Sequence, residues 1–102
     1  MKFILIYITN PTRAEARKIA RHLLKKKLIA CGNIYRSNGL YVWDGKLVDT
    51  TEYVLLGKTV DANFKKIKEE VRKIHPHRIP CIIKIPAEPD GQFFSWVKDE
   101  LE

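Results

Sequence analysis

In the first third of the chain, a continuous run of apolar residues is followed by apolar residues repeated at helical spacing. Residues 3–8 are continuously apolar and stop at Asn10-Pro11, a pattern typical of a strand buried on both faces. Residues 13–28 then repeat apolar side chains at helical spacing. Thr12, with Glu15 three positions later, matches a capping box, so we expect Thr12 to cap this helix. The apolar stripe predicted for the helix consists of Ala16, Ile19, Ala20, Leu23, Leu24 and Leu28.

The middle of the chain predicts two long strands joined by a tight turn. Residues 30–43 carry the aromatic and branched side chains of a strand, with a loosening expected at residues 37–39. Asp44-Gly45 is a strong signal for a two-residue hairpin turn. The return strand is expected over residues 46–56, and Gly57 marks either a bulge or a close approach of two backbones.

The C-terminal part predicts a helix, a strand and a final helix. We expect Asp61 to cap the second helix, which ends before Pro76. Its apolar stripe is expected to consist of Phe64, Ile67, Val71 and Ile74. Residues 81–85 predict a fourth strand, which Pro86 and Pro89 end. The buried side of the final helix is expected to carry Phe93, Trp96, Val97 and Leu101.

The order of these elements predicts an α+β fold, with residues 1–102 in a single domain. Strand, helix, strand, strand, helix and strand make the split βαβ arrangement of ferredoxin-like folds, here with an antiparallel sheet, a long central hairpin and an extra C-terminal helix. Two helices cover only one face of such a sheet. The hairpin carries more aromatic surface than they can bury, which predicts an oligomer. These aromatic residues are Tyr35, Tyr41, Trp43 and Tyr53.

Composition and charge narrow the possible partners. The chain is 45% hydrophobic and 30% charged, the balance of an ordinary soluble domain. A net charge of +7 is compatible with binding to nucleic acid or to an anionic membrane. The basic residues, however, gather on the solvent-exposed faces of the two predicted helices. We therefore expect neither partner. Residues 3–8 are too few for a membrane span or a signal peptide. We therefore expect a cytoplasmic protein in which Cys31, a small buried side chain, and Cys81 stay reduced.

Metal-binding side chains are concentrated in residues 75–81, which contain two histidines, a cysteine and two prolines. Imidazole and thiolate are ligands that copper and zinc prefer. The prolines favour extended backbone, in which His75 and His77 would point the same way and could share one ion. Cys81 would lie roughly 13 Å further along the strand and would join them only through a turn or from another subunit. The alternative is a helix end followed by a strand start, with the histidines on the surface.

Several short motifs in the chain match one known family. They are residues 28–34, residues 41–46, Glu52 ahead of Lys58-Thr59, His75-Pro76 and residues 94–97. In this order and spacing, the chain resembles the CutA family of divalent-cation-tolerance proteins. The resemblance implies a ferredoxin-like subunit, a homotrimer joined through the hairpin strands, and a shape similar to that of PII signalling proteins, with an unidentified signalling partner. It also implies binding of copper and related divalent metal ions, a part in the response to them, and no established catalytic activity or organic cofactor.

Two departures from the family pattern fall in the metal-binding segment. The family usually has tyrosine after His-Pro and glutamate after the second proline, where this chain has His77 and Cys81. Only His75 carries over directly as a candidate ligand, and the two replacements shift the donor set toward softer metals such as copper and zinc. The expected metal ligands are therefore His75, His77 and Cys81, although a site that has drifted is the alternative.

The resemblance further implies a cleft between subunits. The residues that match its lining are Tyr41, Trp43, Glu52 and Lys58. Their alternative role is packing within the hairpin and a structural ion pair.

An RNA-binding module of ferredoxin-like fold is the alternative function, because exposed aromatic side chains on such a sheet can stack on single-stranded bases. The chain lacks the RNP1 pattern, and its basic residues lie on helices away from the sheet face that would stack. A small hydrolase of this fold would need a glycine-rich anion loop, and residues 9–13 supply Arg13 without the glycines. A Cys81 nucleophile with His77 as base lacks a third group to orient the base, so we expect no enzyme.

Overall fold

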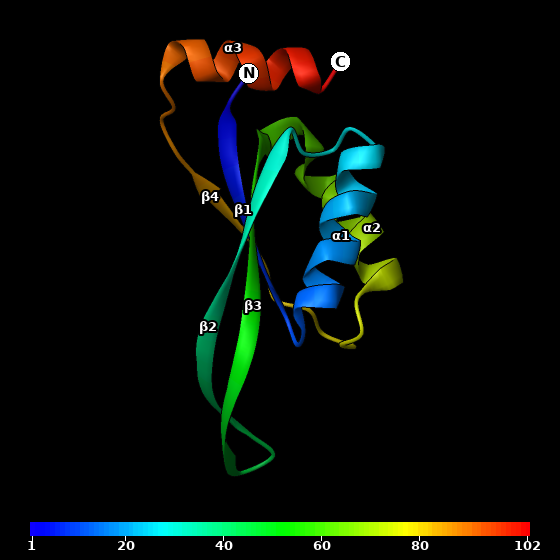
Figure 1. Cartoon of the computed structure of the whole chain (residues 1–102), viewed down its shortest axis with the longest axis vertical. Coiled ribbons are helices and arrows are strands. Elements are labelled where there is room, and N and C mark those ends of the chain that lie inside the picture. The colour runs from blue at the N-terminus through cyan, green and yellow to red at the C-terminus, as the bar shows by residue number, and fades with distance from the viewer.

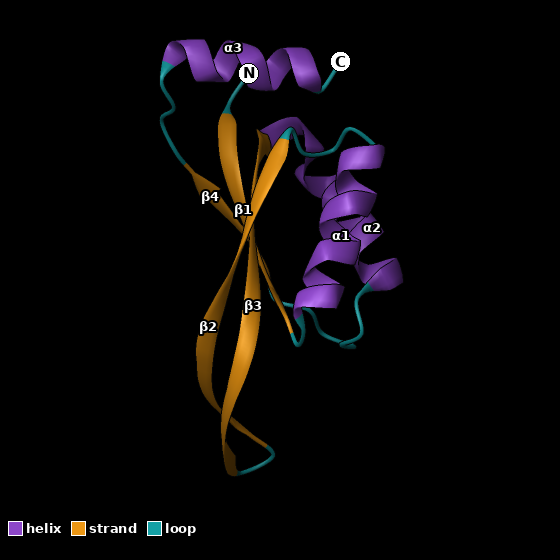
Figure 2. Cartoon of the chain, viewed as in Figure 1, coloured by secondary structure: helices purple, strands orange, loops and turns teal.

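Four strands and three α-helices follow the predicted order (Figure 1) and account for most of the chain (Figure 2). The computed structural model describes residues 1–102. The elements are β1 (Phe3–Asn10), α1 (Arg13–Lys25), β2 (Cys31–Trp43), β3 (Lys46–Val60), the short 3-10 helix η1 (Asp61–Asn63), α2 (Phe64–Ile74), β4 (Ile82–Pro86) and α3 (Gly91–Glu100). The strands form one antiparallel sheet in the order β2-β3-β1-β4, which confirms the ferredoxin-like α+β fold with its long hairpin. No helix is both long and apolar enough to cross a membrane.

One face of the sheet is covered by α1 and α2, and the core lies between these two layers (Figure 1). Ile6 and Ile8 of β1 are fully buried there. On the opposite face Leu5 and Tyr7 are only half-buried, so the prediction of a strand buried on both faces is wrong for a single chain. Gly57 sits opposite Ile6 in a regular ladder, and a Cβ atom there would lie 2.8 Å from the Ile6 side chain. The glycine therefore marks a close approach and not a bulge.

The hairpin of β2 and β3 extends well beyond the rest of the sheet (Figure 1). β1 pairs with β3 only as far as Asn10 opposite Tyr53. β2 and β3 stay paired down to Trp43 opposite Lys46, and the chain is consequently elongated, with extents of 45 × 25 × 21 Å. Residues 37–52, which we call the outer hairpin, therefore form a two-stranded ribbon with no third strand beside it.

Of the two local predictions made for the hairpin, the structure confirms the turn and contradicts the break in the first strand. At the turn, Asp44 (φ 55°) and Gly45 (φ 78°) both adopt left-handed backbone, which confirms the predicted two-residue turn. The loosening predicted at residues 37–39 is wrong, because β2 runs through them without a break. The side-chain amide of Asn38 donates to the carboxylate of Asp49 on β3 (2.8 Å), so this residue links the two strands instead of interrupting one.

The helix caps and stripes also agree only in part with expectation. Thr12 caps α1, because its hydroxyl accepts a hydrogen bond from the backbone N–H of Glu15 (3.1 Å). Asp61 does not cap α2, which begins after η1; its carboxylate instead accepts a hydrogen bond from Lys84 on β4 (2.7 Å). Leu24 was predicted in the apolar stripe of α1 but is 42% exposed. In the last turn of α1 it is Leu23 that is fully buried in the core, whereas Leu24 lies at the surface.

α3 crosses the end of the sheet near both termini (Figure 1). Its Val97 is fully buried against Phe3 of β1 and Ala30. Phe93 and Trp96 were predicted on the buried side but are 37% and 44% exposed, and their rings stack on each other at 5.8 Å. A helix lying across a sheet end meets it along a narrow stripe, so these two rings remain at the surface.

Candidate functional site

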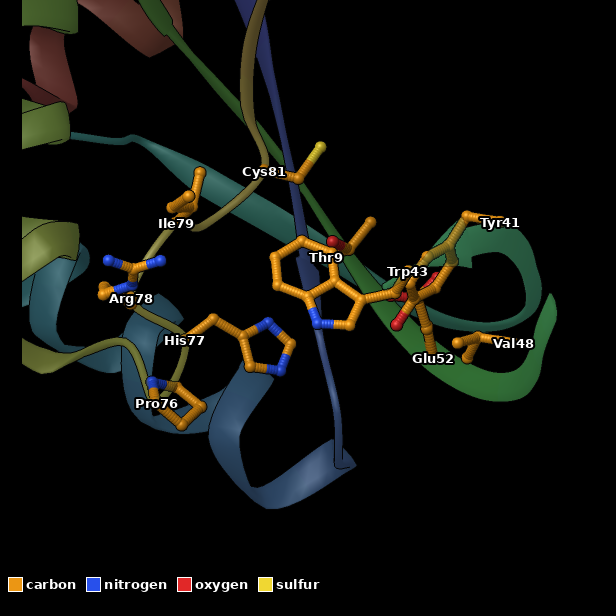
Figure 3. A pocket seen from close by; sticks show the side chains of 10 residues that line it. All are labelled: Thr9, Tyr41, Trp43, Val48, Glu52, Pro76, His77, Arg78, Ile79 and Cys81. Atoms are coloured by element: carbon orange, nitrogen blue, oxygen red, sulfur yellow. The ribbon is translucent and has the colours of Figure 1, made fainter. Parts of the chain in front are cut away.

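A pocket of about 560 Å³ lies where the loop after α2 meets the end of β1 and the outer hairpin (Figure 3). The backbone of residues 75–81 bends repeatedly, so the prediction of an extended strand with side chains on one side is wrong. From β1 and this loop, the lining residues are Thr9, Pro76, His77, Arg78, Ile79 and Cys81. From the outer hairpin, they are Tyr41, Trp43, Val48 and Glu52.

His75 faces inward and holds this loop in place. The residue is 8% exposed, and its Nε2 lies 2.8 Å from the carbonyl oxygen of Thr9. Its Nδ1 accepts a hydrogen bond from the backbone N–H of His77 (3.0 Å), so Nε2 carries the proton and donates to Thr9. Burial lowers the pKa of His75, which keeps the ring neutral as this pairing requires. Neither nitrogen of His75 is free for a metal ion in this arrangement.

The other two predicted ligands both line the pocket. His77 is exposed and its imidazole lies on the Trp43 side of the pocket, whereas the side chain of Cys81 points away from His77 (Figure 3). Cys81 is a free, half-buried thiol. Glu52 is the only carboxylate in the lining. No group of three His, Cys, Asp or Glu side chains lies close enough to hold a metal ion, so a single chain does not assemble a closed metal site.

Three of the four predicted cleft residues meet at this pocket. Tyr41, Trp43 and Glu52 approach it from the outer hairpin. Lys58 lies elsewhere on β3, opposite Cys31, and its amine donates to the side chain of Asn33. In the single chain Lys58 therefore makes a polar contact between β3 and β2.

Thr9 and Arg78 line the pocket but were not predicted as site residues. Thr9 ends the exposed side of β1, and no local pattern connects it with the histidine segment 66 positions later. Arg78 could have been found, because it stands inside the His/Cys cluster and is the one permanent positive charge there.

The sheet face opposite α1 and α2, which we call the open face, continues from the pocket across the strands. Tyr7 lies on it between Leu56 of β3 and Ile83 of β4. Burial raises the pKa of Tyr7, and the nearby Tyr35, Cys81 and Glu52 raise it further, so its phenol stays protonated at neutral pH.

Large apolar side chains remain uncovered on the open face. Tyr35 is 45% exposed, Ile83 is 47% exposed and Trp43 is 61% exposed. Large exposed apolar side chains on one face of a sheet are typical of a contact site.

Comparison with known proteins gives one consistent result. The sequence pattern of the family described as CutA1 divalent ion tolerance protein matches residues 4–100. The divalent-cation tolerance protein CutA of Archaeoglobus fulgidus is 39% identical over 98 residues, covering 95% of this chain and 96% of that protein. The protein of the same description from Thermotoga maritima is 34% identical, covering 96% and 98%. The solved structure of the periplasmic divalent cation tolerance protein CutA from Archaeoglobus fulgidus superposes with a TM-score of 0.94 at 38% identity, covering 98% of this chain and 99% of that one.

Proposed function

Because this chain belongs to the CutA1 divalent ion tolerance protein family, we propose that it binds divalent metal ions, copper in particular, as a homotrimer. The observation that carries the proposal is the gathering of an imidazole, a thiol and a carboxylate in one pocket, from His77, Cys81 and Glu52. These are the kinds of donor that copper and zinc use in proteins. The descriptions of the family and of its members name tolerance to ions and no reaction, so the proposal is a binding protein and not an enzyme.

Copper and zinc suit this donor set better than harder cations do. The thiol of Cys81 and the imidazole of His77 are softer ligands than the carboxylates and carbonyls that magnesium and calcium prefer. One chain does not bring enough of these donors together. The remaining ligands would come from a neighbouring subunit, from solvent or from a molecule bound with the metal. His75 would join them only if its bonds to Thr9 and to the His77 backbone broke.

The open face supports the homotrimer. Its exposed Tyr35, Trp43 and Ile83 would be buried by association with other copies of the chain. Trp43 also lines the pocket, so association through this face would bring a second subunit to the pocket edge. A PII-like signalling role would follow if metal binding changed this shared edge and a partner protein recognised the change.

A copper titration followed by native mass spectrometry tests this proposal, because one spectrum reports both subunits and bound ions. We expect a trimer that takes up about one copper ion per subunit. His77→Ala and Cys81→Ser should each lower copper affinity by about tenfold or more. Cys31→Ser is the matched control, because Cys31 is the other free, half-buried thiol and lies outside the pocket.

Each alternative outcome has a clear meaning. A trimer that takes up neither copper nor zinc would contradict the metal-binding proposal. A monomer would contradict the homotrimer. Equal losses in Cys31→Ser and Cys81→Ser would show that thiol reactivity, and not the pocket, captures the metal.

We propose the cytoplasm as the compartment, because both cysteines are unpaired and such thiols persist best in reducing surroundings. The relative from Archaeoglobus fulgidus is described as periplasmic, which concerns that protein. Fractionation of cells that express the tagged chain would decide the matter, and recovery from the periplasm would contradict the proposal.

A further inference from the structure

The pocket has the dimensions of a small-molecule site. Its volume of about 560 Å³ lies within the range of roughly 300–1,000 Å³ that organic ligands occupy. A metal ion needs donors only about 2 Å from its centre. His77, Cys81 and Glu52 border the pocket without forming such a cage. A bare ion would therefore leave most of this pocket empty.

The charge of the pocket also disfavours a bare cation. Arg78 lines it, is exposed and forms no ion pair with any carboxylate of the chain. Glu52, the only carboxylate in the lining, is formally cancelled by this guanidinium. The whole chain carries a net charge of +7, so its long-range field repels free divalent ions and attracts anions.

We propose that the pocket binds its metal as an anionic complex with a small carboxylate chelator. The inference rests on the proposed metal-binding function and names the form of the metal that is bound. In this arrangement the guanidinium of Arg78 holds a carboxylate of the chelator, because its planar fork matches a carboxylate with two parallel N–H···O bonds. His77 or Cys81 supplies the protein's own donor to the metal. The chelator supplies the donors that one chain lacks.

The outer hairpin provides the wall for the carbon skeleton of such a chelator. Tyr41 and Trp43 are 44% and 61% exposed and border the pocket opposite the loop that carries Arg78 (Figure 3). Aromatic and apolar walls with a few polar groups are the usual lining of organic-ligand sites.

Calorimetry and native mass spectrometry with zinc test the proposal, and zinc is chosen because a thiol cannot reduce it. The full-length chain would be titrated with zinc chloride, with citrate, and with an equimolar mixture of the two. Wild type is expected to bind the mixture about tenfold more tightly than zinc alone, and the adduct mass is expected to contain both components. Arg78→Ala is expected to weaken binding of the mixture by about tenfold to a hundredfold without weakening binding of zinc alone.

Arg72→Ala is the matched control, because Arg72 is an exposed arginine on α2 outside the pocket and its loss changes the net charge equally. Equal losses in the two arginine variants would overturn the proposal, because net charge alone would then explain the effect. An adduct of zinc without citrate would overturn it, as would citrate binding as tightly without zinc. Failure of zinc and copper to bind under every condition would overturn the proposed metal-binding function itself, which separates the two failures.

Discussion

Glu70 is a buried carboxylate between α1 and α2, 2% exposed, with cationic side chains around it. It lies 2.8 Å from His22 and 2.9 Å from Lys73, and the amines of Lys26 and Lys66 are 3.6 and 3.7 Å away. Hydrogen bonds from Lys73 and His22 lower the pKa of Glu70 to about 2. One carboxylate thus joins the basic faces of both helices.

Stability should fall as the pH is lowered from about 4.5 toward 2. Glu70 has a pKa of about 2 in the folded chain and an ordinary value of 4.5, so in this range the unfolded chain takes up a proton that the folded chain still excludes. The contribution is complete above 4.5 and is lost as the pH approaches 2. Urea denaturation at closely spaced pH values measures it, and Glu70→Gln should flatten the dependence.

Glu69→Gln is the control for this experiment, because Glu69 is 47% exposed and has only one distant lysine partner. It should leave the pH dependence close to that of wild type. If Glu70→Gln and wild type lost stability equally over this range, the assignment to Glu70 would be wrong.

Two neighbouring histidines should differ in what they do. His75→Ala should destabilise the chain by about 2–4 kcal/mol, because the Thr9 carbonyl and the His77 N–H would lose their buried partner. His77→Ala should change stability by no more than about 0.5 kcal/mol, because its side chain is exposed. Chemical denaturation of both variants measures the difference, and equal midpoints would contradict the clamping role of His75.

The sequence could nominate both histidines but could not separate them. Their roles depend on the carbonyl of Thr9, which lies 66 positions away along the chain. The donor types in residues 75–81 were evident from the sequence, whereas the direction of each side chain came from the bends in the loop. The metal roles of His75, His77 and Cys81 stay predictions.

At the level of elements, Gly57 sets how closely β1 and β3 can pack. Gly57→Ala should cost about 1–3 kcal/mol, because its new Cβ would lie 2.8 Å from the Ile6 side chain in a tightly packed core. Gly91→Ala is the control, since nothing lies within 4 Å of a Cβ there. Thermal unfolding of the two variants would test this, and a stable Gly57→Ala protein would show that Ile6 can move aside.

Element types were predictable from the sequence because the periods of two and 3.6 residues are local properties. The errors arose where a side chain reached another element. Asn38 looked like a break but bonds to Asp49 across the hairpin. Asp61 looked like a helix cap but pairs with Lys84 on β4. Neither contact can be read from neighbouring residues.

On the scale of the whole molecule, apolar and basic surfaces lie on opposite sides. The lysines and arginines of α1 and α2 are almost all exposed on the helix layer, while the large uncovered aromatic rings of β2 lie on the open face. Apart from Arg78, which lines the pocket with Tyr41 and Trp43, this separation argues against the RNA-binding alternative, because that function needs a basic groove along its stacking rings. It favours an assembly that buries the open face and leaves the helices in water.

Light scattering should therefore give the mass of three chains of 11.9 kDa each. Ile83→Lys should lower that mass, because Ile83 is 47% exposed on the open face, on the edge strand β4, and a charge there resists burial. Leu24→Lys is the matched control, since Leu24 is 42% exposed but lies on α1. A wild-type monomer, or equal masses for the two variants, would contradict assembly through the open face.

The family and the fold could be recognised from short motifs because their order and spacing span most of the chain. The pocket could not, because it combines the end of β1, the loop after α2 and the outer hairpin. Tyr41 and Cys81 line the same pocket because the outer hairpin lies opposite the loop after α2, as Figure 3 shows. That placement is a property of the assembled sheet.

The outer hairpin also has a kinetic consequence. A two-stranded ribbon without a third strand is marginal in water, so the amides of residues 37–52 should open and exchange with solvent far faster than those beside Ile6. Association through the open face would slow this exchange. The aromatic wall of the pocket would then be ordered only in the assembled protein, and ligand affinity would rise with protein concentration until assembly is complete.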